Sequence, residues 1–212
     1  MRLNKVIAAC VGTTAALAAT AATPIAAATG ESVVAGGCRV EANAKVSPGL
    51  TLTSRAFEYH YRGKLDLCVY TGKRAANGGT ISAGEPISVH GHEYQEPVPT
   101  GTGTCLGTAA EGYDFARWKN GTQTIVQFSA TSSNGGPTHL TGSVISSLQL
   151  QAINPLAGAP TTATFKTTNF VGQNVVGLLV FQASDPSLCG TPQGVTSATV
   201  TGVLGHVGLI GG

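Results

Sequence analysis

The chain has few charges and few aromatic residues. Asp, Glu, Lys and Arg make up 10% of its 212 residues, and Phe, Trp and Tyr make up 6%. The net charge of +2 comes from Arg2 and Lys5, because the other ten basic residues balance ten acidic ones. A neutral, weakly charged surface has no electrostatic attraction to nucleic acid or to an anionic membrane. We therefore expect neither as a partner.

Long hydrophobic runs are absent after residue 28, so no membrane span is expected there. At the start, Arg2 and Lys5 precede an Ala-rich apolar stretch over 6–22, and small residues follow at 26–28. This order is typical of a secretory signal peptide with an A-x-A cleavage site. The sequence predicts that residues 1–28 are removed and that the remaining chain, about 184 residues, is secreted into an oxidising extracellular space.

The sequence has no C-x-x-C pair, which argues against a zinc site and against redox catalysis. Cys10 leaves with the leader, and Cys38, Cys68, Cys105 and Cys189 remain. Four cysteines allow three connectivities. Cys38 opens the first predicted strand and Cys68 lies near the end of the next extended stretch, so antiparallel pairing would bring them side by side. We expect the disulfides Cys38–Cys68 and Cys105–Cys189.

Helical periodicity is also absent from the mature chain. Alternating segments are separated by Gly, Asn and Pro turns, a pattern typical of all-β sandwiches and barrels. The sequence predicts an all-β antiparallel β-sandwich with Greek-key connections. It would be a single domain over 38–212, preceded by a flexible segment over 29–37. The predicted strands are Cys38–Lys45, Ala56–Tyr61, Leu65–Thr71, Pro86–Tyr94, Thr104–Thr108, Tyr113–Lys119, Thr122–Thr131, Leu140–Ala152, Thr161–Thr168, Asn174–Gln182 and Val195–Gly205.

A hairpin is expected at Asn120-Gly121, because Asn-Gly favours the type I′ turn that matches strand twist. A two-residue turn there pairs Arg117 with Thr124, Phe115 with Val126 and Tyr113 with Phe128. Asp114, Ala116 and Trp118 then take the opposite face of the hairpin.

The arrangement of turns and cysteines resembles a group of uncharacterised secreted bacterial proteins with Gly/Thr-rich β-sandwiches and two disulfides. The residues that carry the likeness are Cys38 with the turn Ser47-Pro48-Gly49, Cys68, Thr104-Cys105, and the closing stretch 185–205 with Cys189. The resemblance implies the sandwich fold and no particular activity.

One stretch has the spacing of a metal site. From Gly84 to Gly103, the positions of His90, His92 and Glu96 are similar to the first motif of the cupin family, whose histidines and glutamate bind a metal inside a barrel. On a strand, side chains two residues apart share one face. Imidazoles with a carboxylate suit a divalent transition metal. The second cupin motif is incomplete, so the alternative is a strand end with two solvated histidines.

A second candidate is a binding face around Trp118, the only tryptophan, with Arg117 and Asn120 beside it. An indole ring offers a flat platform for sugars or for a protein partner. The alternative is that Trp118 caps the core. Tyr59 and Tyr61 form a similar alternating pair that packing also explains.

Signatures of hydrolases are absent, although five carboxylates crowd the middle of the chain, at Glu85, Glu93, Glu96, Glu111 and Asp114. A glycosidase would need two of them facing each other across a cleft. The sequence therefore favours a non-enzymatic, extracellular binding or surface-associated module without a cofactor, for carbohydrate or protein. The alternative is a cupin-like, metal-dependent enzyme that uses His90, His92 and Glu96.

Overall fold

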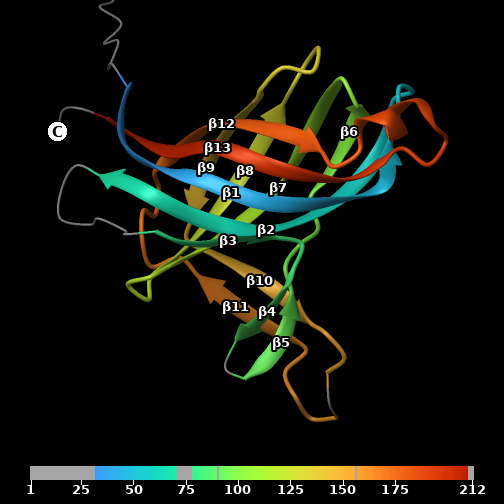
Figure 1. Ribbon diagram of the computed structural model, residues 1–212. Coiled ribbons are helices and arrows are strands. Elements are labelled where there is room, and N and C mark those ends of the chain that lie inside the picture. The colour runs from blue at the N-terminus through green and yellow to red at the C-terminus, as the bar shows by residue number, and fades with distance from the viewer. Residues whose placement is uncertain (1–31, 71–77, 90, 156, 210–212) are drawn as a thin grey trace, which may run out of the picture.

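The computed structural model describes residues 32–70, 78–89, 91–155 and 157–209. The predicted leader lies outside them. Figure 1 shows two unequal parts, a large barrel and a small sheet below it. Eight strands build the barrel wall: β1 (Ser32–Leu50), β2 (Arg55–Tyr70), β3 (Gly79–Ala83), β7 (Gly107–Trp118), β8 (Gln123–Thr131), β9 (Thr138–Ile145), β12 (Asn174–Ala183) and β13 (Val195–Leu209).

The barrel is an antiparallel up-and-down meander. Its strand order is β1-β13-β12-β9-β8-β7-β3-β2, and pairing of β1 with β2 closes the ring. The strand β6 (Thr100–Thr104) pairs with the first part of β2 and the first part of β7. It therefore fills the place between these two strands beyond the end of β3. The prediction of a β-sandwich with Greek-key connections is wrong. Because β1 pairs with the last strand over nearly its whole length, the large sheet closes on itself, and its inner face packs around its own interior instead of against a second sheet.

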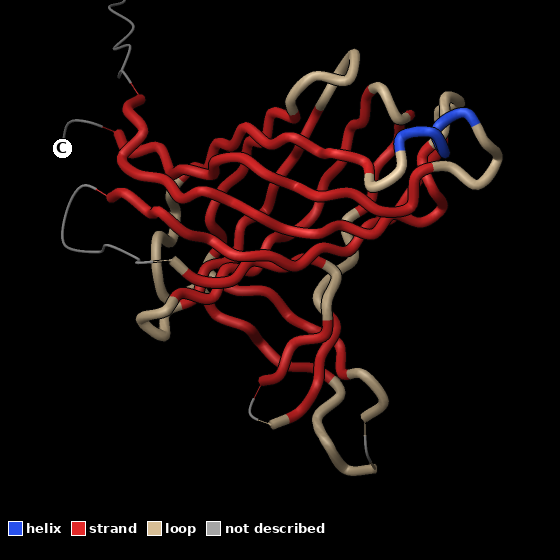
Figure 2. The backbone as a smooth tube through the Cα atoms, viewed as in Figure 1, coloured by secondary structure: helices blue, strands red, loops and turns tan. Residues whose placement is uncertain are grey.

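Alternation along the strands fills the barrel interior. Val40, Ala42 and Ala44 point inward from β1, as Phe57 and Tyr59 do from β2, and all are buried. Figure 2 shows the strands running between two ends of the barrel. The end that holds the short 3₁₀ helix η1 (Pro186–Gly190) is called the open end below, and the opposite end, where β2 and β13 finish, is called the closed end.

The small sheet consists of two hairpins inserted into the meander. Its strands are β4 (Pro86–Val89), β5 (His92–Gln95), β10 (Ser147–Ala152) and β11 (Thr162–Lys166), in the order β11-β10-β5-β4. A second core joins this sheet to the outer face of the barrel, where Phe115 and Ile125 are fully buried against Tyr94, Leu150 and Phe165. The insertion therefore covers part of the outside of the barrel.

Several predicted strand boundaries are wrong. The segments 56–61 and 65–71 belong to the one continuous strand β2 as far as Tyr70, and 140–152 breaks into β9 and β10. The stretch 86–94 is a hairpin that turns at Gly91, with a φ of 82°. β1 already begins at Ser32, inside the segment 29–37 that was expected to be flexible, and it pairs there with β13.

The hairpin at Asn120-Gly121 exists, but its predicted register is wrong by one residue. Arg117 pairs with Gln123 and Phe115 with Ile125. Gly121 has a φ of 81°, and the Trp118 amide donates to the carbonyl of Thr122, so the loop has three residues and ends in a left-handed glycine. That geometry is a type I turn followed by a bulge, which Asn-Gly also accommodates.

Both predicted disulfides are confirmed. Cys38 of β1 bonds Cys68 of β2 toward the closed end, with Cα atoms 4.0 Å apart. Cys105, in the turn between β6 and β7, bonds Cys189 of η1 at the open end, with Cα atoms 6.0 Å apart. Within the described residues, each end of the barrel thus has one disulfide.

Candidate functional site in the barrel interior

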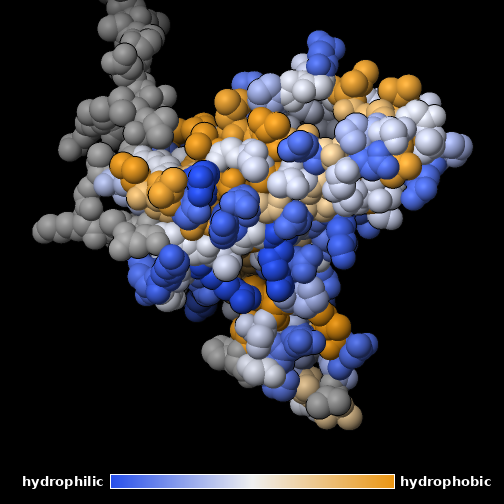
Figure 3. All heavy atoms as spheres, in the orientation of Figure 1, coloured by the Kyte–Doolittle hydropathy of each residue, from blue (hydrophilic) through white to orange (hydrophobic). Residues whose placement is uncertain are grey.

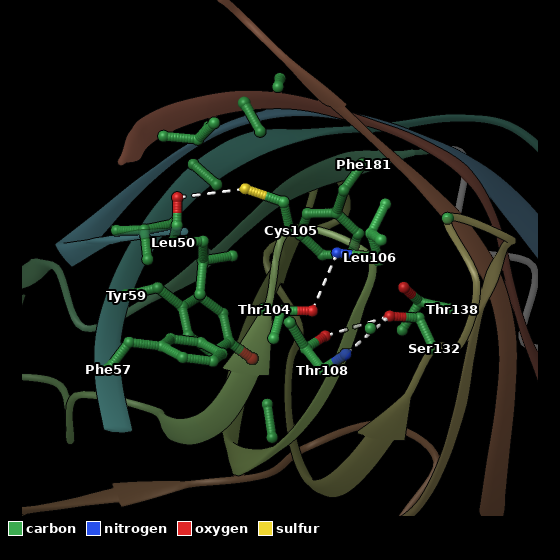
Figure 4. A pocket seen from close by; sticks show the side chains of 18 of the residues that line it. Leu50, Phe57, Tyr59, Thr104, Cys105, Leu106, Thr108, Ser132, Thr138 and Phe181 are labelled. Atoms are coloured by element: carbon green, nitrogen blue, oxygen red, sulfur yellow. Dashed lines mark hydrogen bonds between the residues drawn. The ribbon is translucent and has the colours of Figure 1, made fainter. Parts of the chain in front are cut away.

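The open end of the barrel contains a cavity of about 160 Å³. Figure 4 shows side chains from opposite parts of the wall converging on this space. The apolar part of the lining includes Leu50, Phe57, Tyr59, Ala110, Ala130, Phe181 and Val195, and the polar part consists of Thr104, Thr108, Ser132 and Thr138. Among the residues that the structure describes, no charged side chain lines the cavity. A charged ligand would therefore lose its hydration there without gaining a partner.

Small inward residues make this space. Ala44, Ala110, Ala130 and Ala198 come from four different strands and all line the cavity. A small eight-stranded barrel is just wide enough for ordinary side chains to fill it, or for one small ligand to be held in their place. Alanine at four inward positions leaves that place empty of protein atoms.

The mouth of the cavity is apolar at its rim and hydroxylated just inside. Phe181 is 45% exposed and Leu106 is 55% exposed, and both line the cavity. Behind them, Ser132 Oγ accepts a hydrogen bond from the Thr108 amide at 3.2 Å and lies 3.1 Å from Thr108 Oγ1. The Cys105–Cys189 disulfide lies beside this rim. A neutral molecule with one polar group would match this arrangement.

A buried polar pair lies between the two ends. The Tyr61 hydroxyl donates a hydrogen bond to Oδ1 of Asp114, and the Tyr59 ring lies nearly parallel to the Tyr61 ring with centroids 6.2 Å apart. The pKa of Asp114 is raised to about 7, mainly by burial; the Tyr61 hydrogen bond lowers this pKa, and the charge of Glu96 raises it. Burial also raises the pKa values of Tyr59 and Tyr61 well above the usual range.

The closed end is packed with aromatic rings. Phe170 stacks on Tyr70 and on His206, with centroids 5.3 and 4.9 Å away, and meets Trp118 edge-on at 5.7 Å. A cavity of only about 60 Å³ remains beside Asp114. Within the described residues, neither ring nitrogen of His206 has a hydrogen-bond partner, and burial lowers the pKa of this histidine.

The predicted binding residues are separated by the structure. Trp118 is 9% exposed and points into the barrel, where its indole nitrogen donates to Thr124 Oγ1 at 2.8 Å. It therefore forms no surface platform, which corrects that expectation. Arg117 and Asn120 are exposed outside the barrel, and Asn120 Oδ1 accepts hydrogen bonds from Thr122. Tyr59 and Tyr61 likewise point inward.

The cupin-like residues are not assembled into a site among the residues that the structure describes. His92 is exposed on β5, whereas Glu96 is 1% exposed and accepts hydrogen bonds from Ser82 Oγ at 2.7 Å and the Glu85 amide at 3.1 Å. Burial raises the pKa of Glu96 despite these bonds. His90 lies outside the described residues. Across the described ranges, no cluster of three or more His, Cys, Asp or Glu side chains has the geometry of a metal site.

Comparison with protein-family models, with curated proteins and with solved structures finds no match. The resemblance to secreted two-disulfide proteins stays a prediction, without its sandwich fold. Among the described residues, no helix has the length and hydrophobicity needed to cross a bilayer. The sequence did not predict the cavity, because its pattern is weak. Alanine at alternate strand positions is equally consistent with small side chains in a packed core.

Proposed function

We propose that this is an extracellular, non-enzymatic binding protein whose barrel holds one small, neutral, mostly apolar molecule at the open end. The observation that carries the proposal is the cavity of about 160 Å³, whose described lining consists of apolar side chains, Tyr59 and the Thr and Ser hydroxyls, without a charged group. A dry engineered cavity of about this size accommodates benzene. The ligand class is therefore a single ring or a short branched chain.

Three further features support the proposal. Eight-stranded up-and-down barrels offer a ligand site at their mouth, closed on all sides but one. The exposed Leu106 and Phe181 give an apolar ligand a favourable surface at the opening. Two disulfides suit a chain that works in an oxidising space.

The test is calorimetric titration of the purified, oxidised protein with p-cresol and with benzoate. We expect p-cresol to bind at one site and benzoate not to bind, because the two are similar in size and only the second carries a charge. The variant Ala130→Leu places a larger side chain in the cavity and should abolish p-cresol binding. Ala109→Leu makes the same change at an exposed position on the outer face of β7 and should leave binding intact. Absence of p-cresol binding to the wild type, or equal binding by both variants, would contradict the proposal.

A further inference from the structure

The outside of the barrel carries an open groove that the proposed ligand site does not use. It has a volume of about 830 Å³ and crosses β7, β8, β9 and β12, ending at Val207 of β13. Pro97 and Val98, which lead from the small sheet back to the barrel, form one of its walls. The groove therefore occupies the angle between the outer face of the barrel and the inserted sheet.

Two rows of side chains form the floor of the groove. Tyr113, Gln127, Ser143 and Asn174 are successive partners across the four strands. The second row runs through Glu111, Ser129, Thr141 and Val176 in the same way. Strands lie about 4.8 Å apart, so each row extends about 14 Å. The groove is thus an elongated track rather than a point site.

Beyond Tyr113, the first row carries uncharged polar side chains. Gln127, Ser143 and Asn174 are exposed, and within the described part of the chain none of their side chains hydrogen bonds to another residue. Their amides and hydroxyl both donate and accept hydrogen bonds. Of the described residues that line the groove, Glu111 alone is charged, so an anionic polymer gains no attraction from the groove.

Tyr113 supplies an aromatic surface at one end of the track. Its ring is partly buried and packs against the second core, beneath the small sheet. A ring held in this way loses little conformational entropy when a ligand packs on it. An aromatic ring suits the apolar face of a sugar ring, and the amides and hydroxyls beyond it suit sugar hydroxyls.

From this arrangement we propose that the groove binds a stretch of neutral polysaccharide. The chain would lie across the four strands, with one sugar ring on Tyr113 and the following units over Gln127, Ser143 and Asn174. The spacing between strands is comparable to the repeat of pyranose units in an extended glycan. Oligosaccharides long enough to reach Asn174 from Tyr113 bind more tightly than disaccharides.

The experiment is calorimetric titration of the full oxidised protein with neutral hexasaccharides of β-1,4-, β-1,3- and α-1,4-linked glucose, their disaccharides, and a sulfated glucan. We expect at least one hexasaccharide to bind more tightly than its disaccharide and than the sulfated glucan. Tyr113→Ala should weaken that binding about tenfold. Gln127→Ala, an exposed position that folding does not need, should weaken it about fivefold. Gln182→Ala removes an exposed amide of β12 outside the groove and should change nothing.

Saturating p-cresol should leave the affinity for the hexasaccharide unchanged, because the lumen and the groove lie on opposite sides of the wall. The proposal is overturned if no hexasaccharide binds, if only the sulfated glucan binds, or if Gln127→Ala and Gln182→Ala bind equally well. None of these results bears on the cavity, whose test uses p-cresol alone.

Discussion

The two ends of the barrel are made by the same strands and filled in opposite ways. On β7, the inward residue near the open end is Ala110, whereas the one near the closed end is Trp118. On β13, Ala198 lines the open cavity and His206 stacks into the aromatic cluster of the closed end. One end therefore retains a cavity of about 160 Å³ and the other only about 60 Å³.

This difference shows where the barrel derives its stability and where it has room for a ligand. Buried aromatic rings contribute large contact areas, so the closed end behaves as the core. The open end lacks those contacts. Its exposed apolar rim further lowers the stability of this end, because apolar side chains there stay in water. Figure 3 shows that hydrophobic side chains also gather over the upper part of the barrel, where β12 and β13 lie, with Leu178, Val180 and Val203 among the exposed ones.

The largest expected effect on stability comes from removing the disulfides, and it should differ between the two ends. Cys105 and Cys189 are 84 residues apart in sequence, and Cys38 and Cys68 are 30 apart. A longer closed loop restricts the unfolded chain more. The double variant Cys105→Ala/Cys189→Ala should therefore lose about 4.5 kcal/mol of unfolding free energy, and Cys38→Ala/Cys68→Ala should lose about 3.6 kcal/mol. Denaturant unfolding of both variants measures the difference. A larger loss at the closed end would show that native contacts outweigh loop length.

The next effect lies between the ends, at Asp114. Its pKa of about 7 in the folded protein stands against 3.8 as the ordinary value. The folded state therefore keeps a proton on Asp114 that the unfolded state releases near pH 4. The stability contributed by this bound proton is complete below pH 4 and is lost as pH rises through 7. The loss amounts to about 4 kcal/mol.

The variant Asp114→Asn isolates this term, since an amide oxygen still accepts the Tyr61 hydrogen bond and does not ionise. We expect the variant to gain stability relative to the wild type as pH rises from 4 to 8, measured by urea unfolding at several pH values. A difference that stays constant with pH would contradict the raised pKa. Glu96, whose pKa is also raised by burial, is present in both proteins, so its own burial cancels in the comparison and only its charge coupling to Asp114 contributes to the difference.

Features that depend on local sequence were predicted correctly, whereas the long-range closure of the barrel was not. The all-β class, the turn at Asn120-Gly121 and both disulfides followed from alternation, turn residues and cysteine order. Closure did not, because it depends on pairing between 32–50 and 195–209, and alternating strands suit a barrel as well as a sandwich. The register of the hairpin depended on Gly121 taking the third loop position, and Asn-Gly suits loops of either length.

A matched pair of phenylalanines sharpens the comparison of the ends. Phe170 is 6% exposed at the closed end and has a φ of 64°, a left-handed conformation that the packing of its ring maintains. Phe170→Ala should cost about 3 kcal/mol, the low end of the range because a cavity already borders the ring. Phe181→Ala at the open rim should cost less than about 1 kcal/mol. Thermal unfolding ranks the two, and equal losses would mean that the open end is as firmly packed as the closed one.

The smallest effect comes from filling each end with the same side chain. Ala130→Leu adds three carbons facing the larger cavity and should stabilise the protein by about 1 kcal/mol, since burial outweighs the adjustment of its neighbours. Ala116→Leu faces the smaller cavity, which has room for only part of the new group, and should destabilise by about 1 kcal/mol through overpacking. Chemical unfolding of the two variants gives the signs directly. Opposite signs require that the open end be truly hollow in solution, whereas destabilisation by both would mean that the wall has closed over the space proposed for the ligand.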